Sequence, residues 1–361
     1  MGKLSDKLLL KPEDFESSLR GMEVEGVFNP AAIRLPNGDI MLYVRVAEGP
    51  IKRKHLGSPM IVSKDQSHYK YRLNRRLKRE ILEKKGNVLY LRDGVCRLLN
   101  LSHLRKVILD KNGFNIKKIY QKPFFTGMPH DGNLGVEDPR LTKIGRKYLM
   151  TYVAVSSYEG ASTALAISKN LKSWKREGII FREQNKDVVI FPEKINGMYV
   201  ALHRPEGFFS FSKPSIWISY SKDLTFWGED KSIVHPRRNS WDERRIGSGC
   251  PPIKTNEGWL EIYHGIGGRG ERGVYSAGAF LMDLKNPEKI LARTPKTEPL
   301  MKPGKKYERK GFINNVVFPT GIVRDLNDKD LLIYSGGADS IISVRRMSIK
   351  HILNSMTHHS G

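Results

Sequence analysis

The chain has 361 residues, of which 39% are hydrophobic and 28% are charged, and its 62 Lys and Arg against 38 Asp and Glu give a formal net charge of +24. This composition excludes a disordered or fibrous protein and predicts a folded chain with a large core that attracts anions. The two cysteines lie in unlike contexts, which excludes a disulfide framework and a CxxC metal motif. The N-terminal leucine run is too short for a secretory leader, and no apolar stretch is long enough to span a membrane, so we expect a cytoplasmic protein.

Five segments share a pattern in which a proline near the start of a strand is followed by a short turn and a run of Tyr and aliphatic residues. The segments are 29–46, 137–155, 191–205, 251–265 and 318–339. Turn residues such as Asn-Gly between two apolar runs predict a β-hairpin in each. About five related hairpins predict an all-β fold, a five-bladed β-propeller that forms one domain over residues 1–361. A β-sandwich is the alternative.

A basic insertion of about residues 50–100 interrupts this rhythm, and we place it after the first blade. Residues 52–85 contain 12 Lys or Arg against 3 Asp or Glu. Leu73, Leu77, Ile81 and Leu82 have helical spacing before Gly86, which predicts a short amphipathic helix over 70–86. The segment covers the pocket mouth, contacts another copy of the chain or is a solvated face. Near the C-terminus we expect a closing strand, a short helix and a frayed tail within residues 350–361.

The repeat ends are the predicted functional site, because the innermost strands of propeller blades direct their ends toward one mouth of the channel. They contribute Asn29, Arg45, Glu137, Asp138, Arg140, His203, Arg204, Tyr263, His264 and Asp339. Carboxylates mixed with cations suit a polyhydroxylated substrate together with an anion. In "EDPR" a neighbouring carboxylate raises a carboxyl pKa and a neighbouring arginine lowers it, so the direction stays open. The alternative for this acidic pair is a structural turn with Arg140 in a surface ion pair.

The segments "GNLGVEDPRL", "FPEKINGMYVALHRP", "RRIGSGCPPIKTNEGWLEIYHG" and "YSGGAD" resemble glycoside hydrolase family 130, the β-mannoside phosphorylases and β-mannosidases, which are five-bladed β-propellers. The resemblance implies that Asp138 is the general acid and passes its proton through a mannose hydroxyl. It places Asn29, Arg45 and Asp339 near the mannose. The phosphate-binding cluster that it implies is Arg204, Arg245 and His264, with His203 and Arg244 as the alternatives if the register shifts by one.

The resemblance therefore implies an inverting phosphorylase that cleaves β-1,2- or β-1,4-mannosides with inorganic phosphate and releases α-mannose 1-phosphate. Phosphate is the co-substrate, and we expect no other cofactor, no metal, no membrane and no nucleic acid as partner; a homo-oligomer is left open. Family phosphorylases often have Lys at the position of Arg245, which puts the relative phosphate affinity in doubt. One alternative is an inverting β-1,2-mannosidase with Glu137, Glu206 or Glu243 as base. Another is a propeller that binds an anionic polymer through residues 52–85.

Overall fold

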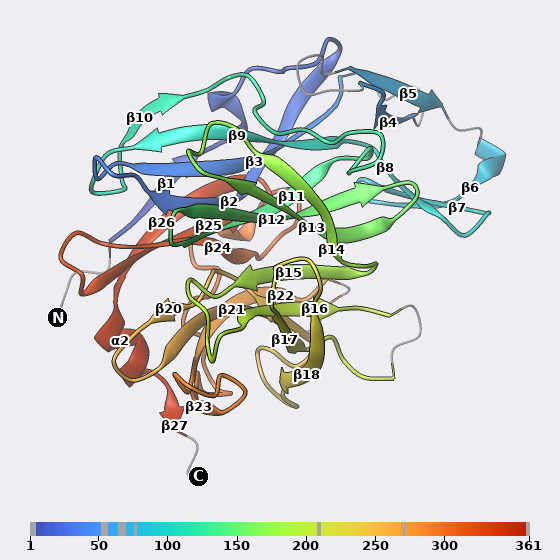
Figure 1. Ribbon diagram of the computed structural model, residues 1–361. Coiled ribbons are helices and arrows are strands. Elements are labelled where there is room, and N and C mark those ends of the chain that lie inside the picture. Colours follow the sequence, from blue (N-terminus) through green and yellow to red (C-terminus); the bar gives the residue numbers. More distant parts are fainter. Residues whose placement is uncertain are drawn as a thin grey trace.

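The computed structural model describes residues 5–51, 57–63, 70–75, 78–207, 211–268, 270 and 272–358. Strands dominate these residues, which confirms the all-β class (Figure 1). The helical elements that the described residues contain are short: α1 (Lys306–Arg309), α2 (Ile349–Asn354) and the 3-10 turns η1 (Pro12–Asp14) and η2 (Lys78–Glu80). None of the helices described is long and apolar enough to span a bilayer.

Five larger antiparallel sheets account for most of the described strands. The first has the order β10-β9-β3-β2, from β2 (Met22–Arg34), β3 (Ile40–Pro50), β9 (Leu101–Leu109) and β10 (Ile116–Ile119). The second runs through β11 (Val136–Ile144), β12 (Lys147–Ser156), β13 (Gly160–Ser168) and β14 (Lys175–Phe181). The third runs through β15 (Asn185–Ile190), β16 (Tyr199–Pro205), β17 (Ile216–Ser221) and β18 (Gly228–Val234).

The fourth and fifth sheets contain the two ends of the chain. The fourth has the order β19-β21-β22-β23-β27, from β19 (Arg245–Ser248), β21 (Trp259–Gly267), β22 (Val274–Met282), β23 (Ile290–Arg293) and β27 (Thr357–His358), with β20 (Ile253–Lys254) also on β21. The fifth has the order β1-β26-β25-β24, from β1 (Ser5–Leu10), β24 (Val317–Arg324), β25 (Asp330–Gly337) and β26 (Ile341–Ser348). The N-terminal strand β1 therefore completes the sheet that the C-terminal strands begin.

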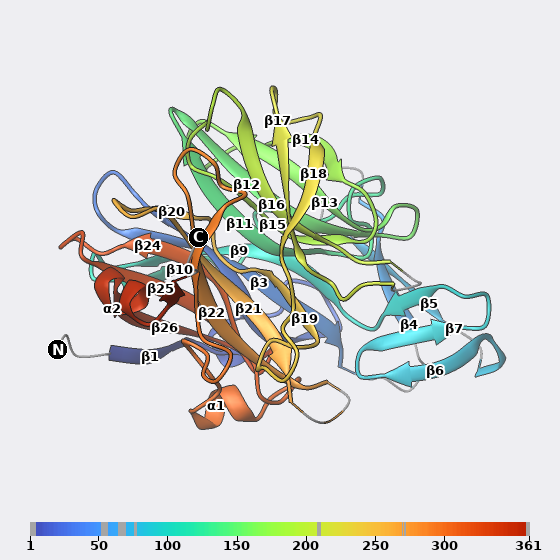
Figure 2. The same cartoon turned by 90° about the horizontal axis from the view of Figure 1, so that it is seen from below.

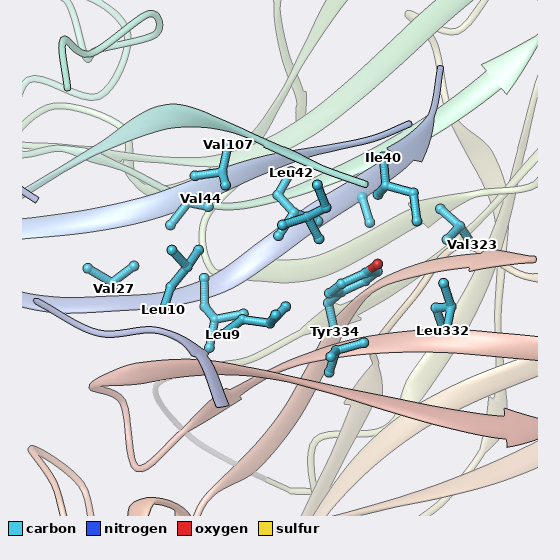
Figure 3. Packing of buried hydrophobic residues seen from close by; sticks show 14 of the residues in the cluster. Leu9, Leu10, Val27, Ile40, Leu42, Val44, Val107, Val323, Leu332 and Tyr334 are labelled. Atoms are coloured by element: carbon cyan, nitrogen blue, oxygen red, sulfur yellow. The ribbon is translucent and has the colours of Figure 1, made fainter. Parts of the chain in front are cut away.

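Each sheet packs on the next through a hydrophobic cluster, and the fifth packs back on the first. Figure 3 shows this closing cluster, in which Val27 and Leu42 of the first sheet meet Leu332 and Tyr334 of the fifth. The Thr320 hydroxyl donates to the Pro30 carbonyl at 2.9 Å and also joins β24 to β2. The sheets thus form a closed ring, and their first strands β2, β11, β15, β19 and β24 face one another at its centre.

Four of the predicted hairpins form the antiparallel pairs β2/β3, β11/β12, β20/β21 and β24/β25. The segment 191–205 contains β16, but its partner strand β15 ends at Ile190, before the predicted start. The closing strand and short helix are β26 and α2. The tail prediction is wrong at Thr357 and His358, which pair with Arg293 and Ala292 of β23 because that outer strand has a free edge; residues 359–361 lie outside the described part.

The basic segment lies within the first sheet rather than after it. Residues 51–100, called the 51–100 segment below, connect β3 to β9, which are hydrogen-bonded neighbours. The predicted helix over 70–86 is wrong, apart from residues 76 and 77, which lie outside the described residues. Instead β4 (Gly57–Ile61) pairs with β5 (Tyr71–Arg75), and β6 (Ile81–Lys85), β7 (Val88–Leu91) and β8 (Cys96–Leu98) form a small sheet. Its strand pairing buries Leu89 and Leu91, which outweighs the helical spacing.

Candidate functional site

A β-bulge occurs in the first strand of each of three sheets and positions part of the site. The ladders of β2, β11 and β15 each break at a bulge, between Phe28 and Ala31, between Glu137 and Arg140, and between Lys186 and Val189. Asn29, Asp138 and Asp187 occupy these bulges with φ of 48°, 48° and 57°. Asn and Asp tolerate this left-handed conformation better than other residues with a side chain. The bulges therefore give each of three adjacent sheets a short polar side chain at the centre of the ring.

Asp138 is held by polar groups from the first sheet. Its Oδ1 accepts hydrogen bonds from Asn29 Nδ2 and Arg45 Nη1, both at 2.9 Å. Arg45 Nη2 donates to Glu137 Oε1 at 2.7 Å, so one guanidinium binds both members of the acidic pair. The Arg45 guanidinium also lies 4.4 Å from the ring centre of Phe28, which fixes its plane. The acidic pair is thus a buried cluster with Arg45, and not the surface turn that was the alternative.

The two carboxyl groups near Arg45 differ in proton affinity. Burial raises the pKa of Asp138, but the charges of Arg45 and Arg140 and the hydrogen bonds from Asn29 and Arg45 lower it to about 2. Burial raises the pKa of Asp339 to about 6, because the attraction of Arg45 is opposed by the charges of Asp138 and Glu137. The arginines therefore lower the pKa of Asp138, which settles the direction that "EDPR" left open. Of these two carboxyl groups, Asp339 has the pKa closer to neutral pH.

Arg140 connects this acidic cluster to a second, cationic cluster. Its Nη1 donates to the Asp138 backbone carbonyl at 2.8 Å, and its Nη2 lies 3.4 Å from Asp187 Oδ1. Asp187 Oδ2 accepts from Arg204 Nη1 and lies 3.5 Å from His264 Nε2. Gly247 permits this contact, since a Cβ there would fall 2.2 Å from Asp187 Oδ2. One buried carboxylate therefore holds two arginines together, and His264 joins the cluster through its contact with Arg204.

The cationic cluster continues to Arg245 through a second carboxylate. Glu206 Oε1 lies 2.8 Å from Arg204 Nη2 and 3.2 Å from Arg245 Nη1. Arg245 Nη2 donates to the Tyr275 hydroxyl at 2.9 Å. The Arg245 side chain is 31% exposed, against 7% for Arg204, so it stands at the open side of the cluster. Two guanidinium groups that share one partly exposed carboxylate form a site that an anion with several oxygens can occupy.

His264 is an uncharged member of this cluster. Burial lowers its pKa well below the usual range, and the charges of Arg204, Arg245 and Arg140 lower it further. Its Nε2 lies 3.1 Å from Arg204 Nη1, so this nitrogen accepts and Nδ1 carries the proton. Nδ1 is buried and has no hydrogen-bond partner among the described residues. The ring packs 4.3 Å from that of Phe318, which leaves a neutral N–H donor in a polar site.

Three of the residues proposed from the sequence lie outside both clusters. His203 hydrogen bonds to Asn185 and Ser219, and burial lowers its pKa to about 4. The Tyr263 hydroxyl donates to Asp242 at 2.8 Å in a buried network with Arg293. Both residues directly precede a cluster member on a strand, so their side chains point to the opposite face.

The third of these candidates is Arg244, the register alternative to Arg245. Its Nη1 donates to the Gly270 carbonyl at 2.8 Å in the glycine-rich loop after β21. Glu243, one of three suggested bases, has its carbonyl bonded by Lys213 Nζ. Among the suggested bases, Glu137 and Glu206 are therefore the ones that belong to the clusters.

Sequence reasoning missed Asp187, Tyr275 and Phe318. Asp187 had a signal, because "KDVVIFP" places an acidic residue directly before an apolar strand, as "EDPRL" does. The third repeat was taken to begin at residue 191, which left the bulge outside it. Tyr275 and Phe318 had no comparable signal, since they come from β22 and β24 and reach the cluster through contacts with Arg245 and His264.

Comparison with known proteins identifies the family. A family described as beta-1,4-mannooligosaccharide phosphorylase, glycoside hydrolase family 130, matches residues 106–358. A beta-1,2-mannobiose phosphorylase of Listeria innocua is 35% identical over an alignment of 361 positions, which covers 96% of each chain. Its structure in complex with beta-1,2-mannobiose superposes with a TM-score of 0.86. A 1,2-beta-oligomannan phosphorylase of Thermoanaerobacter sp. is 40% identical over 246 residues, 68% of this chain and 78% of that protein. This chain belongs to glycoside hydrolase family 130.

Proposed function

We propose that this protein is an inverting glycoside phosphorylase that cleaves a β-mannoside with inorganic phosphate and releases α-mannose 1-phosphate. The observation that carries the proposal is the cluster of Arg204, Arg245 and His264 beside Asp138. The two guanidinium groups offset the charge of phosphate, and the His264 Nδ1–H adds a neutral donor. Because the relatives described above carry β-1,2 names, we propose β-1,2-linked mannosides as substrates and keep β-1,4-linked ones as the alternative.

In the proposed reaction, phosphate and Asp138 act on opposite faces of one mannosyl unit. A phosphate oxygen held by Arg204 and Arg245 forms a bond to the anomeric carbon while the bond to the glycosidic oxygen breaks. The leaving oxygen takes the proton that Asp138 supplies through a mannose hydroxyl. One displacement of this kind inverts the anomeric centre, so a β-mannoside gives an α-phosphate.

Asp138 must take up a proton before it can act as the acid, since Arg45 and Arg140 hold its pKa at about 2 in the structure without sugar. A bound sugar removes water from the carboxylate, and the loss of solvation favours the neutral acid. Asp339, with a pKa of about 6, interacts electrostatically with both Arg45 and Asp138 and holds its proton to a higher pH than Asp138 does. We propose that sugar binding shifts the proton affinity of this pair toward Asp138.

The proposal is tested by cleavage of β-1,2- and β-1,4-mannobiose at increasing phosphate concentration. Sugar release should rise from near zero to saturation as phosphate is added. Equal release with and without phosphate would overturn it. The two substrates measured side by side also decide the linkage.

Hydrolysis is the second candidate, and the position of Glu206 is the observation that favours it. Water needs a general base, and Glu206 lies among the residues that would otherwise hold phosphate. Against hydrolysis, Arg204 contacts one carboxylate oxygen of Glu206 and Arg245 contacts both. These positive charges would oppose the uptake of a proton from water by Glu206. Free mannose formed at full rate in phosphate-free buffer would establish this candidate.

The architecture is part of the proposal. We infer that the five sheets are the blades of one β-propeller over residues 1–361 and that the reaction takes place at the centre of the ring. The contacts of β2 with β11 and β24, and of β15 with β11 and β19, support this inference, as does the pairing of β1 with β26. Binding of an anionic polymer through residues 52–85 has no support beyond charge, and many of those residues lie outside the described part.

A further inference from the structure

A cavity of about 180 Å³ is lined by Arg45 and by no member of the cationic cluster. One wall consists of Arg45, Glu137 and Asp339, which belong to the proposed reaction centre. The facing wall includes Asn87 and Asn100, from the 51–100 segment. The volume is below the roughly 300–1,000 Å³ of sites for drug-sized ligands, so it suits one sugar ring.

The two asparagines are held in place by a chain of hydrogen bonds. Asn87 Nδ2 donates to Asn100 Oδ1 at 3.0 Å, and Asn100 Nδ2 donates to Glu25 Oε2 at 3.2 Å. Glu25 lies over Gly49, where a Cβ would fall 2.0 Å from Glu25 Oε1, so this packing requires glycine at 49. The Asn87 carbonyl also accepts from the Leu99 amide at 2.8 Å. Both carboxamides are therefore fixed before any ligand binds.

Asn87 keeps hydrogen-bonding capacity for a ligand. Its Oδ1 accepts no hydrogen bond from the described residues, while its Nδ2 is engaged by Asn100. The carboxamide oxygen of Asn87 can accept a proton from a sugar hydroxyl group and gives phosphate oxygens no donor. Leu98 adds an apolar contact in the same wall, as the carbon face of a sugar ring requires.

The 51–100 segment is docked against the opposite side of the cavity. Its turn contains Gly86 with φ of 59°, and a Cβ there would lie 2.9 Å from Arg272 Nη2 and 3.8 Å from Phe312. Phe312 also lines the cavity, so the turn meets the far rim next to Asn87. Figure 2 shows β4 to β7 together at one side of the ring of sheets. The segment thus contributes a wall rather than a detached surface feature.

We infer that Asn87, supported by Asn100, is a specificity-determining residue that binds a hydroxyl group of the leaving sugar, and that the 51–100 segment thereby selects this sugar. The inference rests on the proposed function. The cavity adjoins Arg45 and Glu137 but includes none of Arg204, Arg245 and His264. In a single displacement the leaving group is on the side opposite phosphate, so the sugar in this cavity is the one that departs.

The test is the synthetic direction of the reaction, because it varies the two sugars separately. In Asn87→Ala, KM for the acceptor sugar mannose should rise about five- to tenfold, as expected for loss of one uncharged hydrogen bond, while KM for α-mannose 1-phosphate stays unchanged. Asn74→Ala, in β5 and outside the cavity, is the matched control and should equal the wild type. Melting temperatures of all three proteins should agree.

Acceptors that each lack one hydroxyl group show whether Asn87 reads that hydroxyl. The wild type should discriminate against one deoxymannose about five- to tenfold, and Asn87→Ala should lose this discrimination only. An unchanged acceptor KM, or a rise in KM for α-mannose 1-phosphate instead, would overturn the inference while leaving the proposed function intact. A wild type without phosphorolytic or synthetic activity would instead refute the proposed function.

Discussion

Arg45 donates from Nη1 to Asp138 Oδ1 at 2.9 Å, which ties the proposed general acid to a buried cation. The pairing keeps Asp138 ionised and correctly placed at the bulge of β11. It also means that the acid is prepared only when substrate changes its surroundings.

Replacement of the Asp138 carboxyl group by an amide should abolish most of the catalytic activity. Asp138→Asn keeps an oxygen that accepts from Asn29 and Arg45, so the fold should be retained. General acid catalysis contributes about 10²–10⁴-fold, and kcat for mannobiose phosphorolysis should fall by that factor. A variant within a few-fold of wild-type kcat would exclude Asp138 as the acid, and its melting temperature serves as the control.

Arg245→Lys should weaken phosphate binding selectively. A lysine keeps the charge but loses the fork that binds two oxygens, so KM for phosphate should rise about tenfold with little change in KM for mannobiose. Arg244→Lys is the matched control, since Arg244 lies next in sequence but bonds Gly270. If the control variant lost phosphate affinity and Arg245→Lys did not, the assignment of the two arginines would be reversed.

Glu206→Gln separates the two candidate reactions. Glu206 lies 2.8 Å from Arg204 and 3.2 Å from Arg245, where it competes with phosphate for both cations. The uncharged variant should bind phosphate more tightly, with a several-fold lower KM, and should keep its kcat. Loss of activity at every phosphate concentration would instead identify Glu206 as the base of a hydrolase.

Asp339 should lower stability as pH rises. Its pKa is about 6 in the folded protein against roughly 3.9 in an unfolded chain, so the folded state binds the proton more tightly. The contribution of Asp339 to the free energy of unfolding is then highest below pH 4, falls up to pH 6 and stays level above it. Two pKa units correspond to up to about 3 kcal/mol. Denaturant titrations should show that the free energy of unfolding falls more between pH 4 and pH 7 in the wild type than in Asp339→Asn. An equal fall in the two proteins would contradict this prediction.

The hairpins and much of the candidate site could be predicted because they depend on local pattern. Turn residues between apolar runs predicted four hairpins and the second strand of the other one, and equivalent repeat ends predicted Asp138 and Arg45, whose contact is long-range. The errors come from strand alternation and strand pairing. His203 and Tyr263 fall on the opposite face from Arg204 and His264, which the composition of a repeat end does not reveal.

The 51–100 segment shows a second limit. Leucines at helical spacing predicted a helix, but pairing between β6 and β7 is decided by partners outside that window. Gly86 of this segment lies beside Arg272 and Phe312, and Asn87 lines a cavity together with Phe312. These partners are more than 180 residues away in sequence. No local pattern carries this information.

The most direct test of the central claim follows the fate of phosphate by NMR while the protein cleaves β-1,2-mannobiose. Phosphorolysis with inversion predicts that inorganic phosphate is consumed and that α-mannose 1-phosphate appears in equal amount with one free mannose per disaccharide. Two free mannoses per disaccharide, with the phosphate signal unchanged, would contradict the account.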